Sequence, residues 1–200
     1  MKKKIIITGG LGYIGTELCK LYSGVSWHHK IFVIDNRFIS ERVNQLRKWN
    51  IEFIHGDILD VKLVKKHFKD ADVVHHLAGI TDVPKTKSDS NKIKDEKIKE
   101  VGEIGTQNIL DVISNDCKII FPSTHVVFEG IDKVKTDIKE DESTKPVLSY
   151  SSSKAVNEQQ LKQSGKNFII LRLGSVYGYS SDTTRIDIMP NLFSKIASQN

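Results

Sequence analysis

Short apolar runs recur along the chain, and each is about six residues long, a length typical of strands. They are rich in β-branched and aromatic residues, as expected for strands that are buried on both faces of a parallel sheet. The pattern predicts six strands, in the ranges 2–8, 30–35, 51–57, 71–79, 117–124 and 167–173.

Segments with apolar residues at helical spacing lie between these runs. They predict helices at 12–23, 40–49, 60–69, 88–114 and 150–164. Because strand and helix alternate, the connections are expected to be right-handed βαβ units that build one parallel sheet. The expected fold class is α/β, a doubly wound parallel sheet of six or more strands with helices on both faces. The longest stretch without a regular pattern, residues 125–148, is long enough to expect a functional loop.

The composition is that of a soluble protein with a sizeable core, since 38% of the 200 residues are hydrophobic and 28% are charged. No apolar run approaches the roughly 18 residues that a membrane span requires. The run at 5–7 that follows the N-terminal lysines is too short for a secretion signal. The net charge of +5 comes from scattered lysines mixed with acids, which favours a slightly basic enzyme over a nucleic-acid-binding protein. We therefore expect neither a nucleic acid nor a membrane as a partner.

Cysteines and histidines give no metal pattern. Cys19 and Cys117 are isolated and are expected to be inert thiols in a reducing compartment, which favours a cytoplasmic location. Histidines are adjacent at 28–29 and 75–76, but neighbours on a strand point to opposite faces. We therefore predict no metal site.

A glycine-rich turn, TGGLGYIG (8–15), follows the first expected strand and opens the first expected helix. Gly9 permits a tight turn, Gly12 lets a pyrophosphate approach the backbone at the helix N-terminus, and Gly15 lets the helix pack closely on the strand. Glycine-rich turns have many uses, but a turn in this context is typical of the dinucleotide site of a Rossmann fold.

Acidic residues end the second and third expected strands. Asp35 is placed to accept both hydroxyls of an adenosine ribose and to repel a 2′-phosphate, which favours NAD over NADP. Arg37 leaves the alternative open, because its guanidinium group can pair with that phosphate. Asp57 and Ile58 are expected to flank the adenine, the first by a hydrogen bond and the second by apolar contact.

Tyr150 and Lys154 stand four residues apart in SYSSSKAVNE (149–158), so they share one face of the expected helix. An ammonium group near a tyrosine favours the phenolate, which can act as a base. The spacing alone fits equally well a tyrosine that packs and a lysine that is solvated. Ser149 is expected to cap this helix.

Together these motifs resemble the extended short-chain dehydrogenase/reductase family of nucleotide-sugar epimerases, dehydratases and reductases. The resemblance runs over nearly the whole chain and rests on TGGLGYIG (8–15), Asp35, GDILD (56–60), HLAG (76–79), STHVVFEG (123–130), YSSSK (150–154) and RLGSVYG (172–178). It implies NAD as the cofactor and Thr124, Tyr150 and Lys154 as the catalytic residues. It also implies a cofactor site formed by Gly9, Gly12, Tyr13, Ile14, Gly15, Asp35, Asn36, Asp57, Ile58, Leu77, Ala78, Gly79, Tyr150, Lys154 and Val176.

The chain departs from the family pattern in three places. Dehydratases of the family carry Asp-Glu after the active-site threonine, whereas this chain has His125 and Val126, so a 4,6-dehydratase is not expected. Gly102 stands where the family often has Asn, which would remove a hydrogen bond behind the active-site helix. Relatives are also considerably longer, so residues 1–178 are expected to be the NAD-binding domain and residues 179–200 the start of an incomplete substrate-binding region.

The expected function is that of an NAD-dependent nucleotide-sugar epimerase of the 4-epimerase type. Two alternatives stay open: a 4-keto reductase of the same family, and an NAD-binding sensor or interaction protein without turnover. The resemblance further implies a nucleotide-sugar substrate and a homodimer formed through the helices near 88–114 and 150–164.

Overall fold

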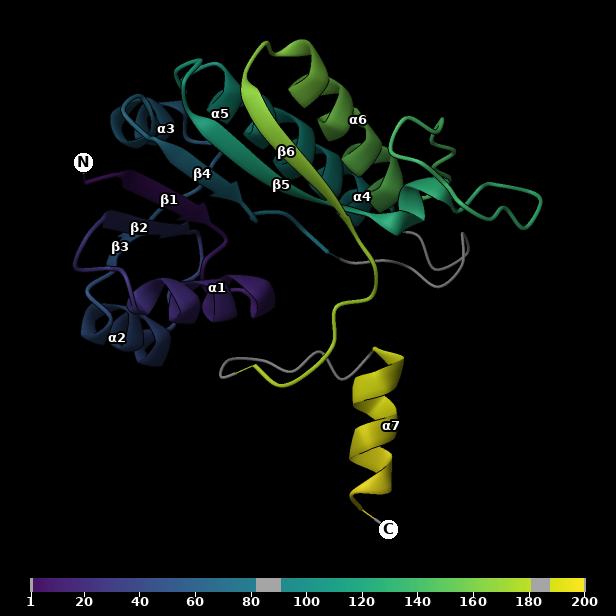
Figure 1. Ribbon diagram of the computed structural model, residues 1–200, viewed down its shortest axis with the longest axis horizontal. Helices are drawn as coiled ribbons and strands as arrows, with labels where there is room; N and C mark the ends of the chain where they lie inside the picture. The colour runs from purple at the N-terminus through teal and green to yellow at the C-terminus, as the bar shows by residue number, and fades with distance from the viewer. Residues whose placement is uncertain (1, 82–90, 181–187, 200) are drawn as a thin grey trace.

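The computed structural model describes residues 2–81, 91–180 and 188–199. These residues contain one six-stranded sheet, in which every pair of neighbouring strands is parallel and the order is β3-β2-β1-β4-β5-β6 (Figure 1). The strands are β1 (Lys4–Thr8), β2 (Lys30–Asp35), β3 (Glu52–His55), β4 (Val73–His76), β5 (Lys118–Thr124) and β6 (Asn167–Leu173). The six predicted strands and the doubly wound parallel sheet are confirmed.

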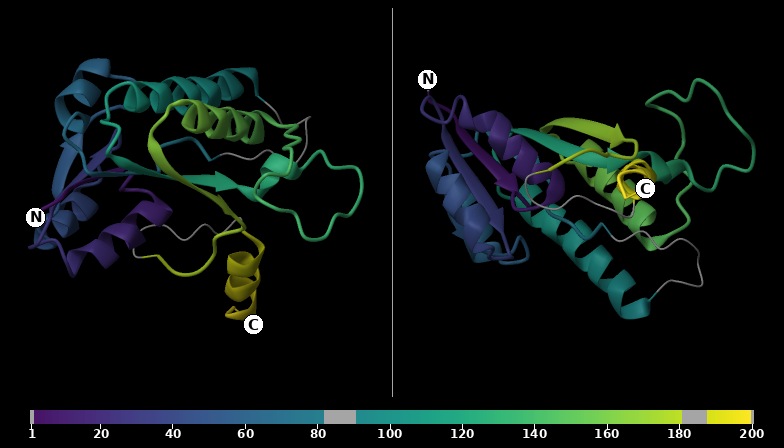
Figure 2. Two further views of the ribbon diagram at one scale, coloured as in Figure 1. Left: turned by 45° about the horizontal axis from the view of Figure 1, so that its top comes forward. Right: turned by 90° about the horizontal axis from the view of Figure 1, so that it is seen from below.

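Helices cover both faces of the sheet. They are α1 (Tyr13–Ser23), α2 (Ser40–Lys48), α3 (Val61–Phe68), α4 (Lys92–Lys99), α5 (Gly105–Leu110), α6 (Ser149–Gln163) and α7 (Met189–Ala197). Figure 1 shows α1 and α2 on one side of the sheet, and α3, α5 and α6 on the other. Helix α7 extends away from the sheet (Figure 2, left).

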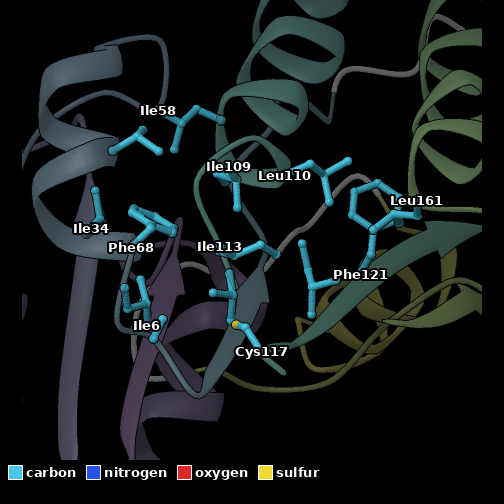
Figure 3. Packing of buried hydrophobic residues seen from close by; sticks show 14 of the residues in the cluster. Ile6, Ile34, Ile58, Phe68, Ile109, Leu110, Ile113, Cys117, Phe121 and Leu161 are labelled. Atoms are coloured by element: carbon cyan, nitrogen blue, oxygen red, sulfur yellow. The ribbon is translucent and has the colours of Figure 1, made fainter. Parts of the chain in front are cut away.

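Alternation along β1 divides the core into two layers. Ile5 and Ile7 face α1 and α2 and pack with Cys19, Val43 and Leu46. Ile6 faces the opposite side, where the larger cluster includes Phe68, Ile109, Leu110, Phe121 and Leu161 (Figure 3). The centre of the sheet is therefore buried on both faces, which explains why its strands read as continuous apolar runs.

The strand order reverses between β1 and β4, since β2 and β3 follow on one side of β1 and β5 and β6 on the other side of β4. In open α/β sheets, ligands bind at the carboxyl ends of the strands where the order reverses. The turn at Gly9 follows β1 at this edge, and the segment 77–79 follows β4 there. The fold thus sets the position of the candidate site before any side chain is considered.

The helix predicted at 88–114 is interrupted in the structure, and residues 88–90 lie outside the described part of the chain. A π-helical turn (Glu100–Ile104) separates α4 from α5 and packs against α6. A Cβ atom at Gly102 would lie 2.4 Å from Ser153 Oγ, so a larger residue there would require the Ser153 hydroxyl to move. Asn157 Nδ2 donates to Gly102 O at 3.0 Å, so α6 itself supplies a hydrogen bond to the backbone at this turn.

The prediction that Ser149 caps α6 is wrong. Ser149 is the first helical residue, and the N-cap position belongs to Leu148. The Glu129 carboxylate takes over the capping, because it accepts hydrogen bonds from Val147 N and Leu148 N, both at 2.7 Å, and from the Ser151 hydroxyl. Glu129 belongs to the loop after β5 and lies too far away in sequence for a local capping pattern to reveal it.

Candidate active site

A cavity of about 1100 Å³ lies at the carboxyl ends of the strands. Its walls come from the β1–α1 turn, the ends of β2, β3, β4 and β5, the first turns of α6, and the segment after β6. Every residue that the sequence singled out lines it: Gly9, Gly12, Tyr13, Ile14, Gly15, Asp35, Asn36, Asp57, Ile58, Leu77, Ala78, Gly79, Thr124, Tyr150, Lys154 and Val176. The structure therefore brings together residues that span positions 9 to 176 of the chain.

The glycine turn is closely packed at all three glycines. Gly9 has φ +65°, and a Cβ atom there would lie 2.8 Å from Ala78 N. A Cβ atom at Gly15 would lie 2.4 Å from Gly9 O, and one at Gly12 would lie 3.1 Å from the same oxygen. These glycines therefore let the turn pack closely against the first turn of α1, and the two form a backbone cradle in which the first N–H groups of the helix have no partner within the helix. This cradle suits a phosphate group.

Asp35 is almost fully buried and is held from both sides. Its carboxylate accepts hydrogen bonds from Leu11 N and from Arg37 N, both at 3.0 Å. The Arg37 side chain folds back onto it, with Nε 3.3 Å from Oδ1. At the end of β3, Asp57 accepts from Asn36 Nδ2 and from Leu59 N, each at 2.9 Å.

Ile58 lines the cavity and also packs in the hydrophobic core. Its side chain is only 3% exposed and packs against Gly105, where a Cβ atom would lie 2.4 Å from Ile58 Cδ1. Asn108 Nδ2 donates to Ile58 O at 3.1 Å. Helix α5 therefore fixes the loop after β3 from behind.

His75 and His76 point to opposite faces of the sheet, as predicted. His75 Nε2 lies 2.7 Å from the Tyr22 hydroxyl of α1. The His76 ring lies on the α5 side of the sheet. Its Nδ1 forms a hydrogen bond with Thr8 Oγ1 and its Nε2 forms one with Thr106 Oγ1, each at 2.9 Å. Thr8 Oγ1 also accepts from Ala78 N at 3.0 Å, so this hydrogen-bonded chain fixes the backbone of the cavity wall after β4. Burial, with a smaller effect of Lys154, lowers the pKa of His76 to about 3.

The buried neutral His76 predicts a loss of stability in acid. The unfolded chain takes up a proton near pH 6.5 and the folded chain only near pH 3, so stability falls as pH decreases through this window. At pH 5 this difference in pKa lowers the free energy of unfolding by about 2 kcal/mol. Urea unfolding at pH 7.5 and pH 5.0 should show this difference in the wild-type chain, and a smaller one in His76→Asn. His28→Asn, at an exposed turn, should behave like the wild type, and equal pH dependence in His76→Asn would contradict the assignment.

Lys154 reaches the cavity from α6 through a closely packed neighbourhood. Its Nζ donates to Pro122 O at 2.9 Å and lies 4.3 Å from the centre of the Phe121 ring. The centre of the Tyr150 ring is 5.9 Å from the same nitrogen. Burial lowers the pKa of Lys154 to about 8, although the carboxylate of Glu158 opposes this. The ammonium group is therefore still the main form at neutral pH.

Glu158 is a site residue that the sequence reasoning missed. It lies four residues after Lys154 on the same face of α6, and that spacing was the available signal. Its buried carboxylate accepts from Ser123 Oγ at 2.6 Å and from Arg172 Nη2 and Nε at 2.7 and 3.0 Å. Burial raises the pKa of Glu158, but the hydrogen bonds from Arg172 and Ser123 outweigh this effect and the net pKa lies below the usual value. This ion pair joins α6 to β5 and β6 directly behind Lys154.

Thr124 is the last residue of β5 and His125 follows it, and both line the cavity. Thr124 Oγ1 accepts from Val126 N at 3.3 Å, which leaves the hydroxyl hydrogen available for another acceptor. His125 Nδ1 lies 3.2 Å from Leu173 O, and since a carbonyl only accepts, this ring nitrogen carries the proton.

Neither cysteine lines the cavity. Cys19 and Cys117 are both buried, and burial raises the pKa of the two thiols to about 12 and about 11. Across residues 2–81, 91–180 and 188–199, no three His, Cys, Asp or Glu side chains gather as metal ligands do. In the same ranges, no helix has the length and apolar character needed to cross a bilayer.

Comparisons with known proteins agree with this geometry. Residues 5–200 match the NAD dependent epimerase/dehydratase family. The chain is 31% identical to a dTDP-D-glucose 4,6-dehydratase from Dictyostelium discoideum over 88% of its own length, and 31% identical to a putative UDP-glucose 4-epimerase from Methanocaldococcus jannaschii over 89%. It spans 44% and 57% of these two relatives.

Among solved structures, a Tyr-to-Phe variant of UDP-glucuronic acid 4-epimerase from Bacillus cereus, in complex with UDP-4-deoxy-4-fluoro-glucuronic acid and NAD, superposes with a TM-score of 0.79 at 25% identity. The match covers 98% of this chain and 64% of that one. On the family match over nearly its whole length, this chain belongs to the NAD-dependent epimerase/dehydratase family, within the extended short-chain dehydrogenases/reductases.

Proposed function

We propose that this chain is the NAD-binding and catalytic part of a nucleotide-sugar epimerase of the 4-epimerase type. The observation that carries the proposal is the pairing of Tyr150 and Lys154 on one face of α6, where both line the same cavity as Thr124 and the glycine turn. An NAD-binding sensor needs the glycine turn, but it has no use for a partly buried lysine held beside a tyrosine.

The residues present fit NAD. The cradle formed by Gly9, Gly12 and Gly15 would hold the pyrophosphate at the first turn of α1, and Asp35 would meet the adenosine ribose. Tyr13, Ile14, Asn36, Asp57, Ile58, Leu77, Ala78, Gly79 and Val176 complete the proposed cofactor site. The nicotinamide, when bound, would accept a hydride from the sugar and later return that hydride to the sugar.

The side chains of the chain itself handle the proton. Tyr150 Oη takes the proton from the sugar hydroxyl that is oxidised and gives it back when the ketone is reduced from the other face. The Lys154 ammonium favours the phenolate that this exchange requires. Thr124, whose hydroxyl hydrogen is available, orients the substrate oxygen. All three groups are needed in both directions of an epimerisation.

The site supports an epimerase better than a dehydratase, although one of the similar proteins is named a dehydratase. His125 and Val126 occupy the two positions after Thr124 where dehydratases of the family carry two acids. Valine cannot transfer a proton, and the His125 ring is held by Leu173 O. A 4-keto reductase uses the same tyrosine and lysine and is the second candidate.

We also propose how the chain divides into a cofactor-binding and a substrate-binding part. Residues 1–178 form the NAD-binding domain, and residues 179–200 begin the region that binds the sugar nucleotide. In support, residues 188–190 at the start of α7 line the cavity. A homodimer through α4 and α6 is consistent with the exposed apolar side chains of Ile93 on α4 and Val156 on α6.

Calorimetric titration with NAD⁺ tests the proposed cofactor site. The wild-type chain is expected to bind NAD⁺, and Gly15→Ala is expected to lose binding by at least about tenfold, because the new methyl group would collide with the backbone of Gly9 and Gly10 and push the glycine turn away from α1. Gly24→Ala is the matched control, since it lies at the other end of α1 and has room for a Cβ atom, with the nearest atom at 3.8 Å. Unchanged binding in Gly15→Ala, or equal loss in both variants, would speak against the site.

A further inference from the structure

We propose that Arg37 narrows the preference for NAD over NADP by competing with the adenosine ribose for the carboxylate of Asp35. The inference rests on the proposed function, in which that carboxylate meets the ribose hydroxyls. It differs from the simple expectation that an aspartate after β2 is free to receive them.

The carboxylate of Asp35 is saturated in this structure. Oδ1 accepts from Arg37 N at 3.0 Å and from Arg37 Nε at 3.3 Å. Oδ2 accepts from Leu11 N at 3.0 Å and from Arg37 Nη2 at 3.5 Å. A carboxylate offers about four lone-pair positions, and four donors occupy them here. Two ribose hydroxyls therefore have to replace donors that are already in place.

The Arg37 side chain is the part that can be displaced. Its two hydrogen bonds are the longest of the four, and its side chain is 52% exposed, whereas that of Asp35 is 4% exposed. The other two donors are backbone N–H groups of the β1–α1 turn and of the segment after β2, which the fold holds in place. The guanidinium group also lies beside the glycine turn, with Nη2 3.7 Å from the position of a Cβ atom on Gly12. It thus occupies the cavity between the two groups that the cofactor needs.

This arrangement has opposite consequences for the two dinucleotides. NAD has to displace Arg37 and offers the released guanidinium no phosphate at the 2′ position. NADP also displaces it, but its 2′-phosphate provides a strong partner for a guanidinium group. Arg37 therefore weakens NAD binding, strengthens NADP binding and narrows the preference that Asp35 creates.

Titration of Arg37→Met with both dinucleotides tests the competition. Exposed ion pairs are weak, so the Kd for NAD⁺ is expected to fall about two- to fivefold. The Kd for NADP⁺ is expected to rise about tenfold or more, because a charge-assisted hydrogen bond to phosphate is lost. Arg47→Met removes the same charge from the exposed face of α2 and should leave both values within about twofold. Weaker or unchanged NAD⁺ binding in Arg37→Met would overturn the proposal.

The same variant separates this proposal from the proposed function. If the wild-type chain bound no NAD⁺, the proposed function would be in error. In that case, NAD⁺ binding gained by Arg37→Met would still show competition, and no gain of NAD⁺ binding would overturn the competition as well. A cofactor-free measurement adds a direct check. In the free protein the NMR chemical shift of the side-chain Nε–H of Arg37 should change in Asp35→Asn. A chemical shift that is unaffected by this substitution would also overturn the proposal.

Discussion

Turnover of a nucleotide sugar by Tyr150→Phe is expected to be lower than that of the wild-type protein by a factor of about 10² to 10⁴, the usual contribution of a positioned proton-transfer group. The phenyl ring keeps the packing of Tyr150 at the start of α6 but has no oxygen that can take or return a proton. The Kd for NAD⁺ should stay within about twofold, because the cradle and Asp35 are untouched. The measurements are steady-state interconversion of UDP-sugars and calorimetric titration of the cofactor.

A matched control distinguishes proton transfer from a general effect of losing a tyrosine hydroxyl. Tyr22 lies on α1 outside the cavity lining, where its hydroxyl contacts His75 Nε2, so Tyr22→Phe should leave turnover unchanged. Wild-type turnover in Tyr150→Phe would end the proton-transfer role. A loss of turnover that came with an equal loss of NAD⁺ affinity would assign Tyr150 to cofactor binding instead.

The largest loss of stability among the charged residues is expected for Glu158→Ala, at about 3–5 kcal/mol. The substitution leaves the guanidinium group of Arg172 without its bidentate partner and Ser123 Oγ without its acceptor. An uncompensated buried charge is more damaging than the absence of both partners. Chemical unfolding monitored by circular dichroism measures the effect.

Two comparisons sharpen this test. The double variant Glu158→Ala/Arg172→Met should be more stable than Glu158→Ala alone, because it removes the unpaired charge. Glu142→Ala breaks the surface ion pair with Lys135 and should change the unfolding midpoint little. If Glu158→Ala unfolded at the same denaturant concentration as Glu142→Ala, the buried pair would contribute nothing that a surface pair does not.

The parts of the fold that could be predicted from sequence are those with a strong local signal. Each strand is an apolar run that ends at a turn, so β2 and β6 were predicted at the bounds observed. The helix at 88–114 was predicted as continuous because nothing local marks the π-helical turn, whose contacts are with residues of α6 that lie far apart from it in sequence. The cap of α6 was misplaced for the same reason, since Glu129 reaches it from a separate loop.

The candidate site, like the fold, could be predicted from sequence only in part. Its residues could be listed because the motifs at the strand ends and on one helix face resemble those of a known family, and the fold then brings all of them to one cavity. Their partners could not be listed. The burial of the Lys154 ammonium against Phe121, the ion pair of Glu158 with Arg172 and the contact of Arg37 with Asp35 all depend on side-chain packing that no spacing rule encodes.

Lys154 also bears on how such a chain evolves. Its pKa falls from 10.5 to about 8 on folding, so at neutral pH the folded state holds this proton less tightly than the unfolded state does, and the difference opposes folding by about 3 kcal/mol. Drift under selection for stability alone would favour an apolar side chain at this position. A lysine there is a departure from the most stable sequence, of the kind that sites selected for activity commonly contain. Positions can be ranked by how much their native residue lowers the free energy of unfolding relative to the most stable alternative. Such a ranking would point to this helix without any knowledge of relatives.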